Sequence, residues 1–166
     1  MIDLDLDPEL ELLRDTARQF GAERLRPRER EFEAARAVDD ATRRAFAEIG
    51  LAAVEWPESL GGAGLGALAR ALVLEELAAA DPGAAFALDP LGPAFYALAE
   101  LGEQPALHEL ATPLLERAGA RAVLFWNGER RVELRAGHAS GVVPWVPAER
   151  VDLLVVLDAD SAAVLD

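Results

Sequence analysis

The segment that most constrains the fold is a glycine-rich loop at residues 56–65, which leads directly into an apolar helix. Pro57 and the glycines after it oppose any regular helix or strand, so residues 57–66 are predicted to form a loop. The residues that follow are apolar nearly all the way round a helix as far as Ala80. Such a helix is normally buried, so we expect residues 65–80 to form the central helix of a helical domain.

Capping signals predict where the neighbouring helices begin and end. Residues 7–9 read Asp-Pro-Glu, which combines a capping carboxylate, a proline suited to the first helical position and an acid facing the positive helix end. This first helix is expected to end near Pro27. Asp39 or Asp40 is predicted to cap a second helix, and Gly50 stands where a helix C-terminal glycine belongs.

Beyond residue 119 the apolar pattern changes from helical to strand-like. The predicted strands are 123–126, 132–134, 142–146, 153–157 and 163–165. The expected fold class is therefore mainly α (α+β), with an amino-terminal bundle of five to six helices in residues 1–118. A small, incomplete antiparallel β region is expected in residues 119–166, because its last strand leaves an open sheet edge that proteins normally cover.

Composition excludes several classes of function. The net charge of −14 at pH 7 opposes nucleic acid and anionic membrane surfaces, so neither is expected as a partner. Without cysteine, disulfides and thiolate chemistry are excluded. No metal site is predicted, because His108 and His138 lie far apart without a patterned third ligand. An acidic amino terminus and the lack of an apolar run of roughly 18 residues predict a cytoplasmic protein.

Four segments of the helical region resemble the acyl-CoA dehydrogenase family, whose members have an amino-terminal helical domain, a middle β-domain and a carboxy-terminal helical bundle. They lie at residues 13–20, 46–51, 57–65 and 72–78, and include the Pro-Glu-Ser-Leu-Gly-Gly-Ala-Gly-Leu loop and a Leu-Val-Leu-Glu-Glu-Leu-Ala helix. The resemblance covers most of residues 10–118 and implies a truncated or degenerate member. The family reaction it implies is the FAD-dependent α,β-dehydrogenation of acyl-CoA thioesters.

The resemblance also implies site residues. Family members place Thr-Glu-Pro and Gly-Ser-Asp contacts to the flavin after the first middle-domain strand, whereas residues 124–129 here read Leu-Phe-Trp-Asn-Gly-Glu. The flavin loop is therefore expected to be lost or shortened, with aromatic side chains in its place. The helix that lines the family's acyl tail maps onto residues 85–93. The implied cofactor-binding residues are Phe125, Trp126 and Trp145, and the implied substrate-pocket residues are Ala85, Phe86 and Asp89.

Two motifs have rival interpretations. Residues 62–67, Gly-Ala-Gly-Leu-Gly-Ala, fit the G-x-G-x-x-A pattern of dinucleotide-binding loops. A Rossmann loop needs a strand directly before its glycines, and none is predicted here, so a packing role is expected instead. Glu75 and Glu76 could serve as acid and base, but structural pairing with arginine is the favoured interpretation.

No catalytic residue is assigned, because the resemblance places the family's proton-abstracting glutamate in the carboxy-terminal bundle. Alone, the chain is expected not to catalyse the family reaction, which needs the base, the flavin and the thioester held together. Three hypotheses remain open: a fragment of a flavin-dependent acyl-CoA dehydrogenase-like protein, a non-catalytic partner subunit of a full-length homologue, or an acyl- or lipid-binding helical module. A further possible partner is a second copy of the chain, in a homo-oligomer.

Overall fold

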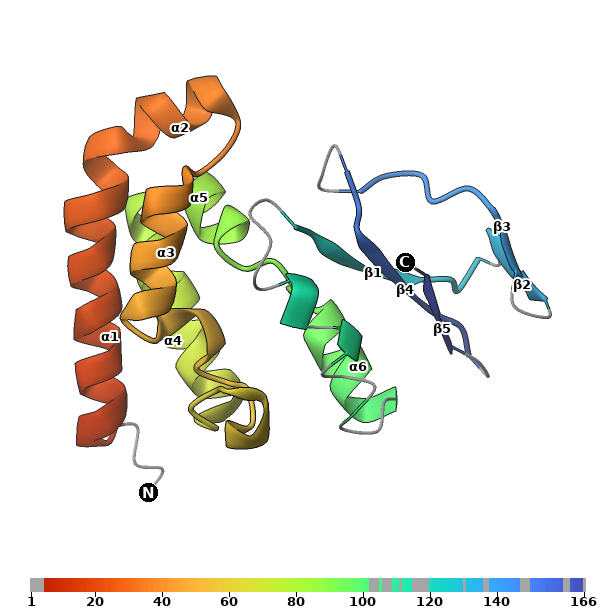
Figure 1. Ribbon diagram of the computed structural model, residues 1–166, viewed down its shortest axis with the longest axis horizontal. Coiled ribbons are helices and arrows are strands. Elements are labelled where there is room, and N and C mark those ends of the chain that lie inside the picture. The colour runs from red at the N-terminus through yellow and green to blue at the C-terminus, as the bar shows by residue number, and fades with distance from the viewer. Residues whose placement is uncertain are drawn as a thin grey trace. The chain divides into compact units, whose positions relative to one another are not determined.

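The computed structural model describes residues 5–101, 105, 109, 110, 112–114, 120–129, 131–135, 138–146, 150–159 and 162–165. These residues belong to two compact units, Met1–Asp89 and Pro90–Asp166, which we call the helical unit and the sheet unit. Figure 1 shows the helices of the helical unit in red to green and the strands of the sheet unit in teal to blue.

The first helix of the helical unit, α1, spans Pro8–Phe20 and is capped as predicted. The Asp7 carboxylate accepts a hydrogen bond of 2.9 Å from the N–H of Leu10. The chain does not end its helical course near Pro27: a π-helical turn, Gly21–Leu25, and a 3-10 turn, Arg26–Arg28, lead into α2, Glu29–Ala35. Proline at the start of a helical turn loses no backbone hydrogen bond, so it does not break the path. The sequence did not predict α2.

The second predicted helix is α3, Asp40–Glu48, and its cap is Asp39. The Asp39 carboxylate accepts hydrogen bonds from the N–H groups of Ala41 and Thr42. Gly50 follows the helix with a φ of 82°, a conformation that favours glycine. Both predicted ends of this helix are therefore confirmed.

The glycine-rich loop folds back onto the segment before it. The N–H groups of Ala63, Gly64 and Leu65 donate to carbonyls within residues 53–56. A Cβ at Gly62 would lie 2.2 Å from the Trp56 carbonyl oxygen, so only glycine fits there. Turns and short 3-10 segments precede these glycines, with no strand between residues 51 and 66. The packing role predicted for the loop is confirmed, and the Rossmann interpretation is not supported.

Helix α4, Gly66–Ala80, follows the loop and lies beside α1 (Figure 1). It buries Val73 and Leu77 in the core, whereas Leu68 is 55% exposed. Glu76 binds Arg18 of α1 through two hydrogen bonds, of 2.7 and 3.0 Å, which confirms its predicted structural pairing. Helix α5, Pro82–Ala87, comes next and contacts both α2 and α4.

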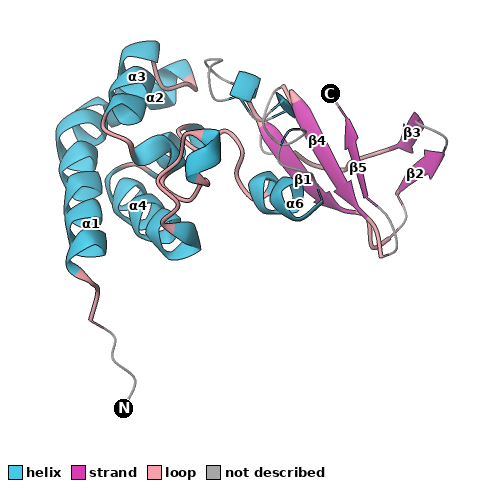
Figure 2. Ribbon diagram, turned by 60° about the horizontal axis from the view of Figure 1, so that its bottom comes forward, coloured by secondary structure: helices cyan, strands magenta, loops and turns pink. Residues whose placement is uncertain are grey.

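The sheet unit combines one helix with two small sheets. Helix α6, Ala94–Leu101, packs against β1 and β4, as Figure 2 shows. One sheet has three strands in the order β1-β4-β5, and the other is the hairpin β2-β3. The strands are β1, Ala122–Trp126; β2, Val132–Arg135; β3, His138–Gly141; β4, Leu153–Leu157; and β5, Ala162–Leu165.

The mainly helical α+β fold class is confirmed, with three differences in the β region. One is β3, which was not among the predicted strands. Strands β1 and β4 pair in parallel, so the larger sheet is mixed rather than antiparallel. The long connection between them carries the β2-β3 hairpin and returns the chain in the same direction. The strand predicted at residues 142–146 is wrong: this segment is irregular, and Pro144 within it has no N–H for a strand ladder.

Candidate functional site

A cavity of about 550 Å³ opens at the carboxyl end of β1. Two aromatic residues of β1 line it, and they are two of the three residues predicted to contact a cofactor. The remaining lining comes from the turn after β1 and from the irregular segment after β3. The lining residues are Phe125, Trp126, Gly128, Glu129, Arg131 and Pro144.

Trp126 owes its position to the edge of the sheet. It is the last residue of β1 and pairs with Leu157 of β4, yet its side chain is 63% exposed. A Cβ at Gly128 would lie 2.5 Å from the Trp126 Nε1, so the indole lies close against the turn. Trp126 therefore presents an accessible aromatic surface beside the cavity.

The charges at the cavity neutralise each other. The Arg131 Nε donates to the Glu129 carboxylate at 2.7 Å, and both residues line the cavity. The cavity thus offers aromatic surface and an ion pair.

Asn127 is a buried polar residue at this corner whose structural role the sequence did not predict. Its side chain is fully buried and hydrogen-bonds the backbone of Val132 in both directions, at 2.7 and 2.9 Å. Its Nδ2 also reaches the Asp158 carboxylate at 3.2 Å. An Asn-Gly pair directly after a strand is a turn signal that could have indicated this position.

Trp145, the third residue predicted to contact a cofactor, does not line the cavity. It is 75% exposed in the irregular segment 142–146, whereas its neighbour Pro144 does contribute to the lining. The structure therefore brings Phe125 and Trp126 together at one cavity and leaves Trp145 on the surface of the same unit.

The three residues predicted to line an acyl pocket have different environments in the helical unit. Ala85 is buried in the core, Phe86 is 46% exposed, and the Asp89 carboxylate binds Arg70 of α4. Arg70 also pairs with Glu55 at 3.0 Å, in the segment just before the glycine-rich loop. The sequence did not predict this ion-pair network, which joins α4 to the chain on either side of it.

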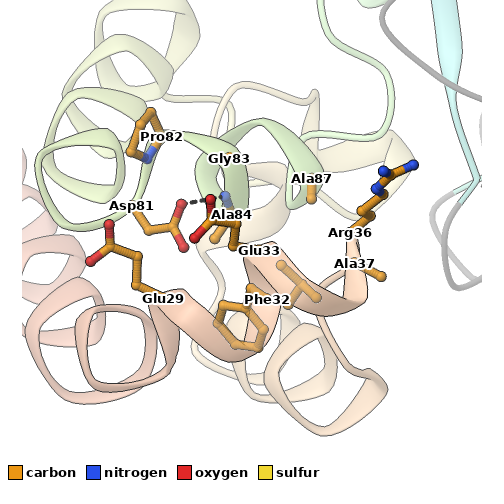
Figure 3. A pocket seen from close by; sticks show the side chains of 11 residues that line it. Glu29, Phe32, Glu33, Arg36, Ala37, Asp81, Pro82, Gly83, Ala84 and Ala87 are labelled. Atoms are coloured by element: carbon orange, nitrogen blue, oxygen red, sulfur yellow. Dashed lines mark hydrogen bonds between the residues drawn. The ribbon is translucent and has the colours of Figure 1, made fainter.

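A second cavity, of about 370 Å³, lies between α2 and α5 in the helical unit (Figure 3). None of the three predicted acyl-pocket residues lines it. Its polar lining includes the carboxylates of Glu29, Glu33 and Asp81, while the guanidinium of Arg36 points away from them in this view. The Asp81 carboxylate accepts a 3.0 Å hydrogen bond from the Ala84 N–H and so caps α5. This acidic cavity does not suit an anionic thioester such as acyl-CoA.

Metal binding and membrane insertion have no structural counterpart in the described part of the chain. No group of three or more His, Asp or Glu side chains there is arranged to hold a metal ion. His138 is exposed on β3, and His108 lies outside the described residues. Within those same residues, no helix combines the length and apolar character that a bilayer crossing requires.

Comparisons with known proteins agree with this architecture. The family description "Acyl-CoA dehydrogenase, N-terminal domain" matches residues 7–116. Benzylmalonyl-CoA dehydrogenase of Aromatoleum aromaticum (strain DSM 19018 / LMG 30748 / EbN1) is 34% identical over 146 residues, which are 85% of this chain and 38% of that protein. The chain thus spans well under half of this curated relative.

Solved structures share the fold. Butyryl-CoA dehydrogenase from Megasphaera elsdenii matches with a TM-score of 0.61 at 22% identity, over 75% of this chain and 33% of that one. A chain of the electron transferring flavoprotein structure of Acidaminococcus fermentans matches with a TM-score of 0.72 at 19% identity, over 99% and 49%. A variant of the Tcur3481–Tcur3483 steroid ACAD matches with a TM-score of 0.65 at 26% identity, over 94% and 46%.

The helical order, the glycine-rich loop before α4 and the β region after α6 are therefore features of a known family. The family match covers residues 7–116 of 166. The chain belongs to the acyl-CoA dehydrogenase family.

Proposed function

We propose that this chain contributes an aromatic flavin-facing surface and part of the acyl-binding region to an FAD-dependent acyl-CoA dehydrogenase-like protein. The observation that carries this proposal is the cavity at the end of β1, which both Phe125 and Trp126 line. Its volume of about 550 Å³ lies within the usual range of small-molecule sites. Family membership supplies the class of reaction, α,β-dehydrogenation of an acyl-CoA thioester.

The aromatic residues that line the cavity support a flavin ring as its ligand. Aromatic side chains stack on planar rings, and the Glu129–Arg131 pair adds no net charge to oppose a neutral ring. We propose that Phe125 and Trp126 face the ring at the cavity and that Trp145, exposed on the same unit, makes a further flavin contact. When bound, the flavin would supply the acceptor for a hydride from the β-carbon of the thioester.

The proposed acyl-binding residues, Ala85, Phe86 and Asp89, belong to the helical unit. Phe86 offers exposed apolar surface for a hydrocarbon chain. Ala85 is buried in the core, and Asp89 forms an ion pair with Arg70. These contacts would hold α5 and the residues after it in place. We retain acyl-CoA as the proposed substrate class on this basis.

We propose that the chain by itself does not turn over an acyl-CoA. The family reaction needs a base for the α-proton, and the carboxylate at the β1 cavity, Glu129, is engaged by Arg131. The base and the remaining flavin contacts would come from other parts of the family architecture or from another subunit. Steady dehydrogenation of butyryl-CoA by the purified chain, with an artificial electron acceptor, would contradict this.

Titration of the 166-residue chain with FAD tests the flavin-facing surface. Flavin absorbance and fluorescence are recorded as the chain is added, for the native sequence and for Trp126→Ala. We expect binding by the native chain and a dissociation constant about tenfold higher for the variant, because one stacked aromatic contact can be worth about 1.4 kcal/mol, which corresponds to a tenfold change. Leu12→Ala is the matched control, since Leu12 is an equally exposed apolar residue in the helical unit.

FAD binding by the control and by Trp126→Ala distinguishes a role of the cavity from a nonspecific effect of substitution. The control should bind FAD as the native chain does, which attributes the loss in Trp126→Ala to the cavity. If saturating FAD leaves the flavin spectrum unchanged with the native chain, or if Trp126→Ala binds equally well, the flavin-facing role of this surface is disproved.

A second candidate is a non-catalytic partner subunit of a full-length homologue. One similar solved structure, the Tcur3481–Tcur3483 steroid ACAD, carries two protein designations, which supports an assembly of unlike chains. Co-purification with a full-length homologue, without flavin retained on this chain, is the expected result. A free-standing acyl-binding module is less favoured, because the cavity in the helical unit carries three carboxylates.

Three further properties remain predictions. We propose that residues 1–118 form the amino-terminal helical domain of the family and that residues 119–166 form part of its middle β-domain. We also propose a cytoplasmic location, and a homo-oligomer as an alternative assembly. Size-exclusion chromatography with light scattering on the isolated chain measures the last of these directly.

A further inference from the structure

We propose that Asn127 is a positioning residue that sets the orientation of Trp126 at the β1 cavity, an inference that rests on the flavin-facing function proposed above. Asn127 follows Trp126 directly and contributes nothing to the cavity lining. Its side chain is fully buried, and its amide and carbonyl groups are both hydrogen-bonded. A buried polar side chain satisfied in this way fixes its surroundings more strongly than an apolar one.

The bonds of Asn127 connect three separate segments of the sheet unit. Its backbone N–H donates to the carbonyl of Leu157 at 2.7 Å, which continues the pairing of β1 with β4 by one residue. Its Nδ2 reaches Asp158, just beyond β4, at 3.2 Å. Its side chain also holds both backbone groups of Val132, the first residue of β2. Asn127 thus joins the three-stranded sheet to the hairpin.

This arrangement restricts Trp126 from both sides. On one side, Trp126 pairs with Leu157 in the sheet. On the other, the turn held by Asn127 carries Gly128, whose missing Cβ leaves room for the indole Nε1. If Asn127 released the turn, Gly128 would move relative to the indole, and the exposed aromatic face would lose its defined orientation.

Asparagine suits this position better than its closest analogues. An aspartate would keep one acceptor for the Val132 N–H but lose the donors to the Val132 carbonyl, and it would face the carboxylate of Asp158. A serine would be too short to reach all three partners. The role therefore depends on a side-chain amide, with its donor and acceptor at one end.

The test uses the near-ultraviolet circular dichroism of Trp126 in the 166-residue chain. The Trp126 signal is obtained by subtracting the spectrum of the same chain carrying Trp126→Phe from the spectrum of each chain. We expect Asn127→Asp and Asn127→Ser to reduce this difference signal at least twofold and to raise the dissociation constant for FAD about fivefold or more. Asp158→Asn keeps an acceptor oxygen and should change neither quantity, which makes it the matched control.

A double variant distinguishes a role of Asn127 in positioning Trp126 from general destabilisation of the sheet unit. Asn127→Asp combined with Asp158→Asn removes the repulsion between carboxylates and supplies a donor in the reverse direction, so part of the Trp126 signal should return. An unchanged Trp126 signal in both single variants would overturn the proposal, whatever happens to FAD binding. Loss of cooperative unfolding of the sheet unit in both would also overturn it, because Asn127 would then be a folding residue.

FAD affinity is interpreted separately from the Trp126 circular dichroism signal. If the native chain binds no FAD, the flavin-facing function fails, but the Trp126 signal still tests whether Asn127 positions the indole. If the native chain binds FAD and the Asn127 variants lose the Trp126 signal without losing affinity, the positioning holds in structure but not in function, and the proposal is rejected.

Discussion

At the residue scale, Asp39 shows how one carboxylate stabilises two elements. It caps α3 through the N–H groups of Ala41 and Thr42, and it accepts a 2.7 Å hydrogen bond from Arg28, in the turn before α2. Burial opposes ionisation of Asp39, but hydrogen bonds from Thr42 and Arg28 outweigh it and lower its pKa to about 2. The ionised form is therefore favoured in the folded state.

This shift predicts a pH dependence of stability. Because the folded-state pKa lies below the ordinary value near 3.9, the stabilisation is fully present above about pH 4 and is lost as pH falls toward about 2. Asp39→Asn keeps a good cap and removes the charge. Above pH 5 the variant should be less stable by no more than about 1 kcal/mol, because the Asp39–Arg28 pair is about one third exposed to solvent.

Urea unfolding at pH 5, 3 and 2, followed by far-ultraviolet circular dichroism, measures this difference. The difference in the free energy of unfolding between the native chain and Asp39→Asn should decrease steadily from pH 5 to pH 2. Asp40→Asn is the control, since the neighbouring Asp40 is exposed and accepts no capping hydrogen bond. A difference between the native chain and Asp39→Asn that is the same at all three pH values would refute the assignment.

At the scale of elements, α4 depends on one buried stripe despite its apolar sequence. Leu77 is fully buried among core side chains, whereas Leu68 on the same helix is 55% exposed. Leu77→Ala should lower the free energy of unfolding by about 3 kcal/mol, because it removes a buried side chain and leaves a cavity. Leu68→Ala should change it by less than about 0.5 kcal/mol.

The pair is a matched comparison, since both substitutions replace leucine by alanine within one helix and leave helix propensity nearly equal. Urea unfolding monitored by circular dichroism gives both values. Equal losses for the two variants would mean that α4 is covered all round, by another copy or another chain, under the conditions of the measurement.

At the scale of the whole molecule, the chain is built from two compact units. The main core cluster, from Ala17 to Leu88, lies entirely within the helical unit. The ion pairs of Arg70 with Glu55 and Asp89 also stay within that unit. The helical unit therefore has the internal contacts that an independently folding domain requires.

We expect residues 1–89 to fold without the rest of the chain. Far-ultraviolet circular dichroism should show the helical spectrum, and heating should give a single cooperative transition that Leu77→Ala shifts to lower temperature. A gradual, non-cooperative loss of helical signal in the shortened chain would show that the helical unit needs the sheet unit to fold.

The helix boundaries could be predicted wherever the signal is local. Asp7, Asp39 and Gly50 act through groups within a few residues, so their types alone indicate where a helix begins or ends. Helix α2 was missed because its start is one of several turns linked without a break after α1. The strand expected at 142–146 was wrong because apolar residues suit a sheet only where backbone partners are available.

The sequence by itself determined the family, the mainly helical class and the packing role of the glycine-rich loop, because each depends on residue type and short spacing. Only the tertiary structure decided that β1 and β4 run in parallel, that Arg70 binds carboxylates from two distant segments, and that Asn127 secures the turn beside Trp126. Those features join residues far apart along the chain, and short-range sequence patterns do not record which distant groups will meet.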